Sequence, residues 1–164
     1  MQFSLIDRIL ELEPGHRIQA VKCVALSEDY LADHFPKFPV LPGVLMIEAM
    51  TQSAAWLIRK SENFSNAIVM LKEVRNVRYA NFVQPGQTLN ITAEITEQDE
   101  RFTTVKANGK VDGRSCVGAR LVLERFNMGD TNPNEAASDA YTRFEMSKLF
   151  DLLYRPIDDP ATTK

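Results

Sequence analysis

Residues 43–62 read GVLMIEAMTQSAAWLIRKSE, a run that is apolar on almost every side when it is drawn as a helix. A helix of this kind is stable where other elements cover most of its circumference. Arg59 and Lys60 close the run, where cations suit the negative end of a helix dipole. The chain must therefore bury one long helix, and this requirement limits the folds it can adopt.

The segments around this helix alternate apolar and polar residues with the period of a β-strand. Pro14-Gly15 and Asp112-Gly113 are turn signals that join neighbouring strands into hairpins. Expected strands lie in residues 5–12, 16–26, 66–79, 87–97, 105–111 and 117–123. An α+β fold follows, in which one antiparallel sheet wraps around one long central helix.

The composition is that of one soluble domain with an ordinary core. The chain has 164 residues, of which 45% are hydrophobic. Its net charge of -3 and its pI near 5.5 argue against a nucleic-acid binder. No apolar run reaches the roughly 18 residues of a membrane span, and residues 1–15 do not resemble a signal peptide. We expect a cytoplasmic protein without membrane or nucleic-acid partners.

Metal and cofactor sites are not expected. Cys23 and Cys116 are far apart and lack a C-x-x-C spacing, so both are expected to be buried thiols in strands. The two histidines have no carboxylate cluster at short spacing, which argues against a transition-metal site.

The C-terminal part of the chain differs in composition from the rest. Residues 127–138 are polar and turn-rich, and we expect a linker that separates a domain of residues 1–127 from an extension of residues 128–164. Ser138 can cap a helix that ends near Arg155, before Pro156. An apolar stripe follows at helical spacing, formed by Met146, Leu149, Phe150 and Leu153. Such a helix should dock on the body of the protein or on a partner chain and be structural.

The stretch 34-HFPKFPVLPGVLMIEAM-50 carries two candidate catalytic groups. Glu48 sits in the apolar helix without a cation three or four residues away, so burial would raise the pKa of its carboxyl and suit a general acid. The alternative is that Glu48 faces solvent at an edge of the helix. His34 lies in the loop that feeds the helix and has the side chain best suited to base work near pH 7. The alternative is an ordinary structural histidine.

Three prolines stiffen the loop between these groups, since each fixes a backbone φ angle; they are Pro36, Pro39 and Pro42. Pro42 falls near the first helical position, and Gly43 allows a ligand to approach the backbone closely. The free amides of the helix start can then stabilise an oxyanion on a thioester carbonyl. A base, an acid and an oxyanion site suit removal of a proton alpha to a carbonyl and expulsion of a beta leaving group.

The segment 34-HFPKFPVLPGVLMIEAMTQ-52 resembles the signature of the hot-dog-fold 3-hydroxyacyl-acyl-carrier-protein dehydratases of the bacterial type II fatty-acid pathway. In that family the histidine of HFP and the glutamate of PGVLxIEAxxQ are catalytic. These positions match His34 and Glu48, which are 14 residues apart. The resemblance spans roughly residues 5–126 and continues in 7-DRILELEPGHRIQAVKCV-24, 83-VQPGQTL-89 and 111-VDGRSCVGARL-121.

The resemblance implies a fold, an assembly and a reaction. It implies a hot-dog fold and a homodimer, which in this family often forms a trimer of dimers, with His34 of one chain facing Glu48 of the other. His34 would remove the C2 proton of a 3-hydroxyacyl thioester, Glu48 would protonate the departing C3 hydroxyl, and the Gly43 amide would hold the carbonyl oxygen. The remaining substrate-site candidates are Val44, Gln52, Phe38 and Tyr79. A related branch that also isomerises the double bond carries aspartate at the helix position, and Glu48 places this chain outside it.

Some residues depart from the family pattern. Asp33 replaces a usual glycine, and its charge would raise the pKa of His34. The segment 79-YANF-82 replaces a basic run that is thought to meet the acidic acyl-carrier protein. With an overall negative charge, docking of that carrier needs a local basic patch. Its candidates are Lys37, Arg59, Lys60, Arg75 and Arg78.

Other functions on this fold remain open from the sequence. One is a dehydratase of a specialised lipid or polyketide pathway, and another is a thioesterase, although hydrolases of this fold generally lack the H-F-P…P-G-V-L string. A third is a non-catalytic acyl-binding subunit, which would need neither His34 nor Glu48. The acyl chain length, and the choice between carrier protein and coenzyme A, are left open.

Overall fold

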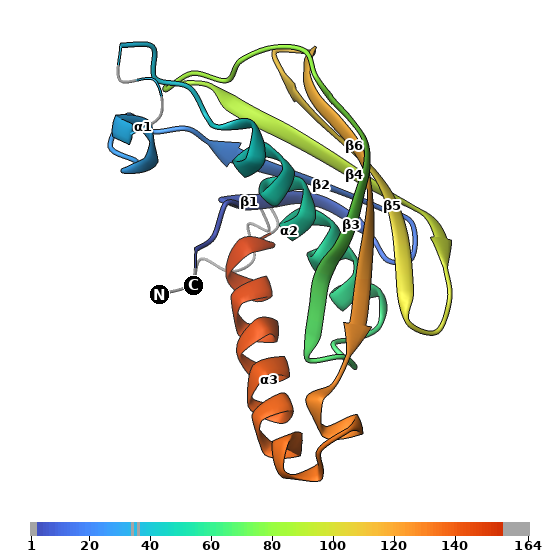
Figure 1. The fold of residues 1–164 in the computed structure, drawn as a ribbon. Coiled ribbons are helices and arrows are strands. Elements are labelled where there is room, and N and C mark those ends of the chain that lie inside the picture. Colours follow the sequence, from blue (N-terminus) through green and yellow to red (C-terminus); the bar gives the residue numbers. More distant parts are fainter. Residues whose placement is uncertain (1–2, 34, 36, 156–164) are drawn as a thin grey trace, which may run out of the picture.

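The computed structural model describes residues 3–33, 35 and 37–155. One antiparallel sheet curves around a single long helix, α2 (Gly43–Ser61), as Figure 1 shows. The sheet has the strand order β1-β2-β4-β5-β6-β3. The strands are β1 (Arg8–Glu13), β2 (Arg17–Cys23), β3 (Ile68–Tyr79), β4 (Thr88–Gln98), β5 (Phe102–Val111) and β6 (Arg114–Phe126). This is the hot-dog arrangement expected from the sequence, and β1 and β3 form the two edges of the sheet.

The inner face of the sheet supplies the cover that α2 requires. Alternate residues of the central strands point inward and are buried, while their neighbours point outward. On α2, Ala49, Met50, Ala54 and Leu57 have no exposed surface. The strand periodicity and the nearly all-apolar helix therefore describe the two sides of one core.

Polar residues fit into this buried helix because they bond to its own backbone. The hydroxyls of Thr51, Ser53 and Ser61 each donate to the carbonyl four residues earlier, at 3.0, 2.9 and 2.6 Å. Pro42 is the N-cap of α2 rather than its first helical residue, and its carbonyl accepts from the amides of Leu45 and Met46. The helix thus begins without a side-chain cap.

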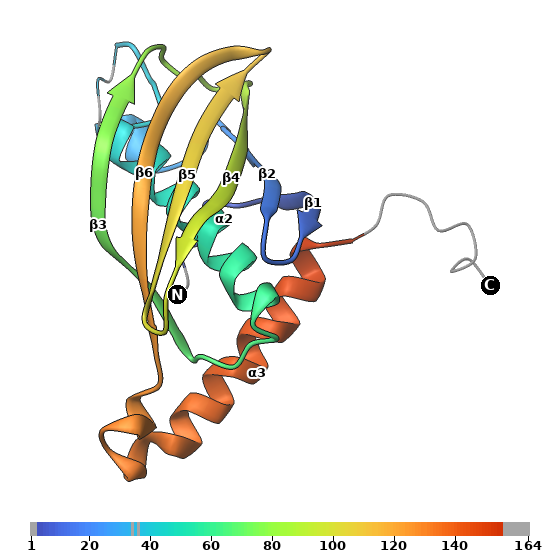
Figure 2. The ribbon, with the colours of Figure 1, turned by 90° about the vertical axis from the view of Figure 1, so that its right-hand side faces the viewer.

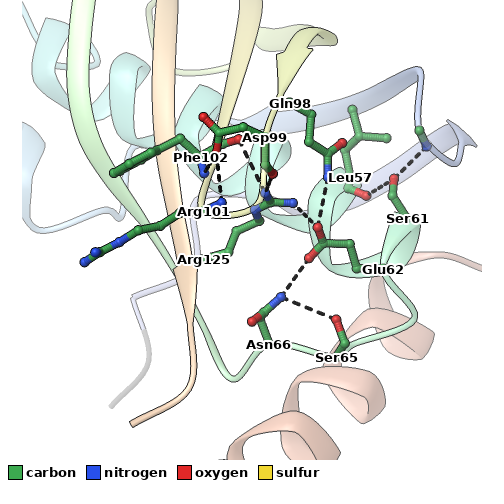
Figure 3. A network of polar contacts seen from close by, with 11 residues as sticks. Leu57, Ser61, Glu62, Ser65, Asn66, Gln98, Asp99, Arg101, Phe102 and Arg125 are labelled. Atoms are coloured by element: carbon green, nitrogen blue, oxygen red, sulfur yellow. Dashed lines mark hydrogen bonds and ion pairs between the residues drawn. The ribbon is translucent and has the colours of Figure 1, made fainter. Parts of the chain in front are cut away.

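A polar network joins the C-terminal end of α2 to the neighbouring strands (Figure 3). Arg125 on β6 is buried and donates to the Glu62 carboxylate and to the Asp99 carbonyl. Glu62 also accepts from the side chains of Gln98 and Asn66, at 2.9 and 3.0 Å. Because the buried guanidinium has a carboxylate partner, the network holds the helix end against the β4–β5 turn.

The C-terminal extension forms the helix α3 (Ala136–Leu153), which lies on the side of α2 away from the sheet (Figures 1 and 2). Phe150 is 2% exposed, and its ring centroid lies 6.2 Å from that of Trp56 and 5.7 Å from that of Phe64. The expectation of a helix docked on the body is confirmed. It begins earlier than Ser138 would allow as a cap, and Pro156 lies outside the described residues.

The connection to α3 is more ordered than a linker. It contains two 3-10 turns, η1 (Met128–Asp130) and η2 (Pro133–Glu135). The buried carboxylate of Asp139 on α3 accepts from the amides of Met128 and Gly129 at 3.2 and 2.7 Å. These bonds fix the angle at which the chain enters α3.

One further expectation needs correction, and one element is new. Cys116 is buried but Cys23 is exposed, because the inward positions of β2 are Ile18, Ala20 and Lys22. The proline-rich connection before α2 contains a short helix that the sequence pattern did not indicate, α1 (Tyr30–Asp33). Among the described residues, no helix has the length and apolar character needed to cross a membrane.

Candidate active site

Glu48 lies half-buried on α2, and its carboxylate is held by a neighbour one turn later. Gln52 donates from Nε2 to Glu48 Oε1 at 2.9 Å and to the Phe3 carbonyl at 3.0 Å. Gln52 Oε1 accepts from the amide of Leu5 at 2.8 Å. Gln52, a substrate-site candidate from the sequence, thus joins the N-terminal segment to the candidate acid.

His34, the candidate base, lies outside the described residues, as does Pro36. The residues on either side of His34 are described. Asp33 ends α1, and Phe35 adopts a left-handed backbone conformation with φ of 53°. A bulky residue in this region marks a tight, constrained turn. The amide of Phe38 donates to the Phe35 carbonyl at 2.7 Å, which closes that turn.

A buried ion pair anchors the segment that leads to this turn. Lys22 Nζ lies 3.0 Å from Glu28 Oε2 and donates to the Cys23 carbonyl at 2.8 Å. The Tyr30 hydroxyl donates to Glu28 Oε2 at 2.6 Å. Burial acts to raise the pKa of Glu28, but the Tyr30 hydroxyl, the Ala25 amide and Lys22 together lower it. Burial and the Glu28 carboxylate raise the pKa of Tyr30.

Sequence reasoning missed this anchor, which we call the Lys22–Glu28–Tyr30 cluster. Its signal in the sequence was a lysine at an inward position of the β2 alternation, since such a lysine needs a buried partner. The cluster ties α1 to β2. Because α1 ends at Asp33, this contact anchors the chain just before His34.

The start of α2 borders a cavity of about 270 Å³, lined among others by Phe35, Leu41, Gly43, Met46, Tyr79 and Phe82. The ring of Tyr79 lies so close to Gly43 that an added Cβ would come within 2.8 Å of it. Within the described residues, the amides of Gly43 and Val44 have no hydrogen-bond acceptor. They are therefore available to a ligand oxygen. Phe38 packs edge-on against Phe82 at a centroid distance of 5.5 Å and borders the same region.

Gly43 and Glu48 face different sides of the helix. Five residues separate them, which corresponds to a rotation of about 140° around the axis at 3.6 residues per turn. The free Gly43 amide points along the helix axis at its N-terminal end, whereas the Glu48 side chain leaves the side of the helix, so the two groups of one chain are directed to different surroundings.

The five basic candidates for carrier docking fall into two groups. Lys37, Arg75 and Arg78 are exposed, and Arg75 makes two hydrogen bonds to Glu73, at 2.7 and 2.6 Å. Arg59 points inward and donates to the carbonyls of Asn66 and Ala67, at 3.3 and 3.0 Å. Burial lowers the pKa of Arg59 to about 10. Lys60 Nζ lies 5.2 Å from the centre of the Phe150 ring.

Comparisons with known proteins agree with this architecture. A family model described as a FabA-like domain matches residues 1–120. A 3-hydroxyacyl-[acyl-carrier-protein] dehydratase FabZ of Rickettsia bellii is 41% identical over 120 residues, which are 73% of this chain and 83% of the relative. The FabZ of Geobacillus thermodenitrificans is 36% identical over 135 residues, which are 80% of this chain and 89% of the relative.

Two solved structures share the fold at lower identity. The dehydratase heterocomplex ApeI:P from Xenorhabdus doucetiae matches with a TM-score of 0.64 and 22% identity, over 81% of this chain and 90% of the other. The protein smu.793 from Streptococcus mutans, bound to acetyl CoA, matches with a TM-score of 0.58 and 13% identity, over 76% and 91%. The residues matched by the family model end before α3 begins.

Proposed function

This chain belongs to the FabA-like family, and we propose that it removes water from a 3-hydroxyacyl thioester on acyl-carrier protein, giving a trans-2-enoyl thioester for fatty-acid biosynthesis. The observation that carries the proposal is the placement of Glu48. Its carboxylate lies on the buried helix that also presents the free amides of Gly43 and Val44. Relatives named 3-hydroxyacyl-[acyl-carrier-protein] dehydratase FabZ, with identities to this chain that include 41% and 35%, support the same reaction.

The reaction needs a base at C2 and an acid at C3. His34 takes the C2 proton, and the electron pair of that bond forms the C2–C3 double bond. The C3–O bond breaks as Glu48, in its protonated form, donates to the leaving hydroxyl, which departs as water. The Gly43 amide stabilises the negative charge that develops on the thioester oxygen. Transfer of the proton from His34 back to Glu48 restores the starting state, and no cofactor enters the balance.

The active site is shared between two copies of the chain. His34 and Gly43 of one copy face Glu48 of the other, which suits the different directions of Gly43 and Glu48 on one helix. β3 is an edge strand of 12 residues, and it exposes Met70, Val77 and Tyr79. Pairing of β3 with β3 of a second copy would cover this edge and make the interface two-fold symmetric.

Docking of the carrier uses the exposed cations among the five candidates, which are Lys37, Arg75 and Arg78. Arg59 and Lys60 contribute less to carrier binding. The guanidinium of Arg59 donates to the carbonyls of residues 66–67, and the ammonium of Lys60 lies over the Phe150 ring. Residues 1–127 form the catalytic domain, and the enzyme works in the cytoplasm as a homodimer.

The decisive experiment follows two products in parallel. The protein is incubated with 3-hydroxyacyl chains on acyl-carrier protein and on coenzyme A, and the enoyl absorbance and the free thiol are recorded together. We expect the enoyl product without thiol release. Thiol release without the enoyl product would instead identify a thioesterase, and the absence of both would indicate an acyl-binding subunit.

A further inference from the structure

A second cavity, also of about 270 Å³, lies between α2, β3, α3 and the N-terminal segment. It is separate from the cavity at the start of α2, since the two share no lining residue. We call it the α3 pocket. Its wall includes Gln52, Ala55, Trp56 and Arg59 from α2, with Val69 from β3 and Met146 and Leu149 from α3.

The α3 pocket begins beside the candidate acid. Glu48, Gln52, Ala55 and Arg59 follow one another at steps of four, three and four residues, which places them on one stripe of α2. Gln52 is part of the pocket wall and also donates its hydrogen bond to Glu48. A ligand group at Glu48 can therefore continue along the same face of the helix into the pocket.

The pocket wall is chemically suited to a hydrocarbon chain. Most of the side chains on it are apolar, namely those of Phe3, Ala55, Trp56, Val69, Met146 and Leu149. Arg59 lies at the far end, where its guanidinium bonds to the carbonyls of residues 66–67. Gln52 and Arg59 are separated by seven helical residues, or about 10 Å along the axis. The pocket is thus a short, mostly apolar groove that begins near an acid and has a polar end.

The wall formed by α3 is held firmly in place. Phe150, one residue after Leu149, is buried against Trp56 and Phe64. The FabA-like family model ends at residue 120, so Met146 and Leu149 add a wall that lies beyond the matched domain. If Met146 and Leu149 limit the length of a bound ligand, this limit comes from the C-terminal extension and not from the matched domain.

We propose that the α3 pocket binds the distal hydrocarbon part of the acyl chain whose C3 carbon meets Glu48, and that Met146 and Leu149 set the chain length. This assignment rests on the proposed dehydratase function and names the part of the substrate that the extension contacts. Methylene groups gain free energy by leaving water for this wall, while a chain that extends beyond the groove meets Arg59 and its bound carbonyls.

A chain-length profile tests the assignment. We measure kcat/KM for unbranched 3-hydroxyacyl chains on carrier protein, from four to sixteen carbons as an approximate range, and compare long with short chains. A bulkier Met146→Trp should lower the ratio of long-chain to short-chain kcat/KM by roughly tenfold, since lost methylene contacts have effects of this size. Leu149→Ala should shift the optimum to longer chains. Tyr141→Trp is the matched control, because Tyr141 is on α3 but is 68% exposed. The ratio of long-chain to short-chain kcat/KM of this variant should equal that of the wild type.

A second measurement uses the unaltered protein and does not depend on turnover. Trp56 is the single tryptophan of the chain and is part of the pocket wall. Saturated acyl-carrier-protein conjugates that carry bromine near the end of the chain should quench its fluorescence, and conjugates with bromine beside the thioester should not.

The outcomes separate the pocket from the proposed function. An enoyl product with an unchanged chain-length ratio in both pocket variants, or equal quenching from both bromine positions, would overturn the pocket assignment alone. Absence of enoyl product at every chain length would overturn the dehydratase proposal, and position-dependent quenching of Trp56 would then still support an acyl pocket.

Discussion

Gln52 donates a hydrogen bond of 2.9 Å from Nε2 to Oε1 of Glu48, and the same side chain holds the backbone of Phe3 and Leu5. The bond fixes the rotamer of a carboxylate that would otherwise be free to turn on the helix surface. Proton transfer depends steeply on such placement, because the reacting atoms must be within hydrogen-bond reach.

We therefore expect Gln52→Met to lower kcat for dehydration by about tenfold or more while KM changes little. The chain offers a matched control. Gln98 makes the same type of bond to Glu62, also at 2.9 Å, away from the candidate site. Gln98→Met should leave kcat unchanged. Equal kinetics for both variants and the wild type would mean that Gln52 does not position the acid.

The proposed sharing of the active site between two chains predicts complementation between two inactive variants. His34→Ala and Glu48→Gln should each lower the dehydration rate by roughly 10²–10⁴, the contribution of a general base or acid. When the two variants are unfolded and refolded together, mixed dimers should regain activity, because one of their two sites has both residues intact. The size of the refolded protein confirms that dimers have formed. If the refolded mixture is then as inactive as each variant alone, His34 and Glu48 act within one chain.

The Lys22–Glu28–Tyr30 cluster predicts a specific loss of stability in acid. The pKa of Glu28 is lowered in the folded protein from its ordinary value of 4.5. A lowered pKa contributes stability that is complete above the ordinary value and is lost as pH falls through the folded value. The difference in unfolding free energy between the wild type and Glu28→Gln, from urea titrations, should thus shrink below about pH 4. Glu73→Gln, at an exposed ion pair with Arg75, should show a smaller difference that salt removes. A Glu28 difference that persists unchanged in acid would contradict the role of its charge.

The exposed cations on β3 predict a carrier-specific effect. Charge reversal at Arg75 and Arg78 should raise KM for carrier-bound substrate and barely change KM for a short coenzyme A analogue, since only the carrier presents an extended acidic protein surface to β3. Lys106 lies exposed on β5, two strands away from β3, and Lys106→Glu serves as the control. Equal losses on both substrates would show that the arginines are not a carrier patch.

Docking of α3 predicts a large stability difference between two phenylalanines of the same helix. Phe150 is 2% exposed and Phe144 is 60% exposed. Phe150→Ala should cost about 3–5 kcal/mol of unfolding free energy, as for other buried phenylalanines. Phe144→Ala should cost little.

Truncation after Phe126 should also lower thermal stability, while dehydration of short-chain substrates remains measurable. Complete and immediate hydrogen exchange across α3 in the intact protein would rule out the docked helix.

Much of this protein follows from local patterns in its sequence. The apolar run of residues 43–62 and the alternating strands determine a buried helix under one sheet, because side-chain periodicity decides which face of an element is buried. The stripe that contains Phe150 likewise determines that the C-terminal helix docks. The spacing of His34 and Glu48 in their motif indicates the reaction class without any structure.

Other features depended on which elements meet in space. Arg59 was expected on the surface, yet it turns inward because the chain after α2 brings the carbonyls of Asn66 and Ala67 within its reach. Cys23 is exposed because Lys22 takes the inward position of β2, where Glu28 compensates its charge. Met146 reaches the face of α2 that carries Gln52 because α3 packs against that helix. A sequence determines which side of an element is apolar, but only the packing of distant segments decides which residue covers it, and that choice determines the wall of the α3 pocket.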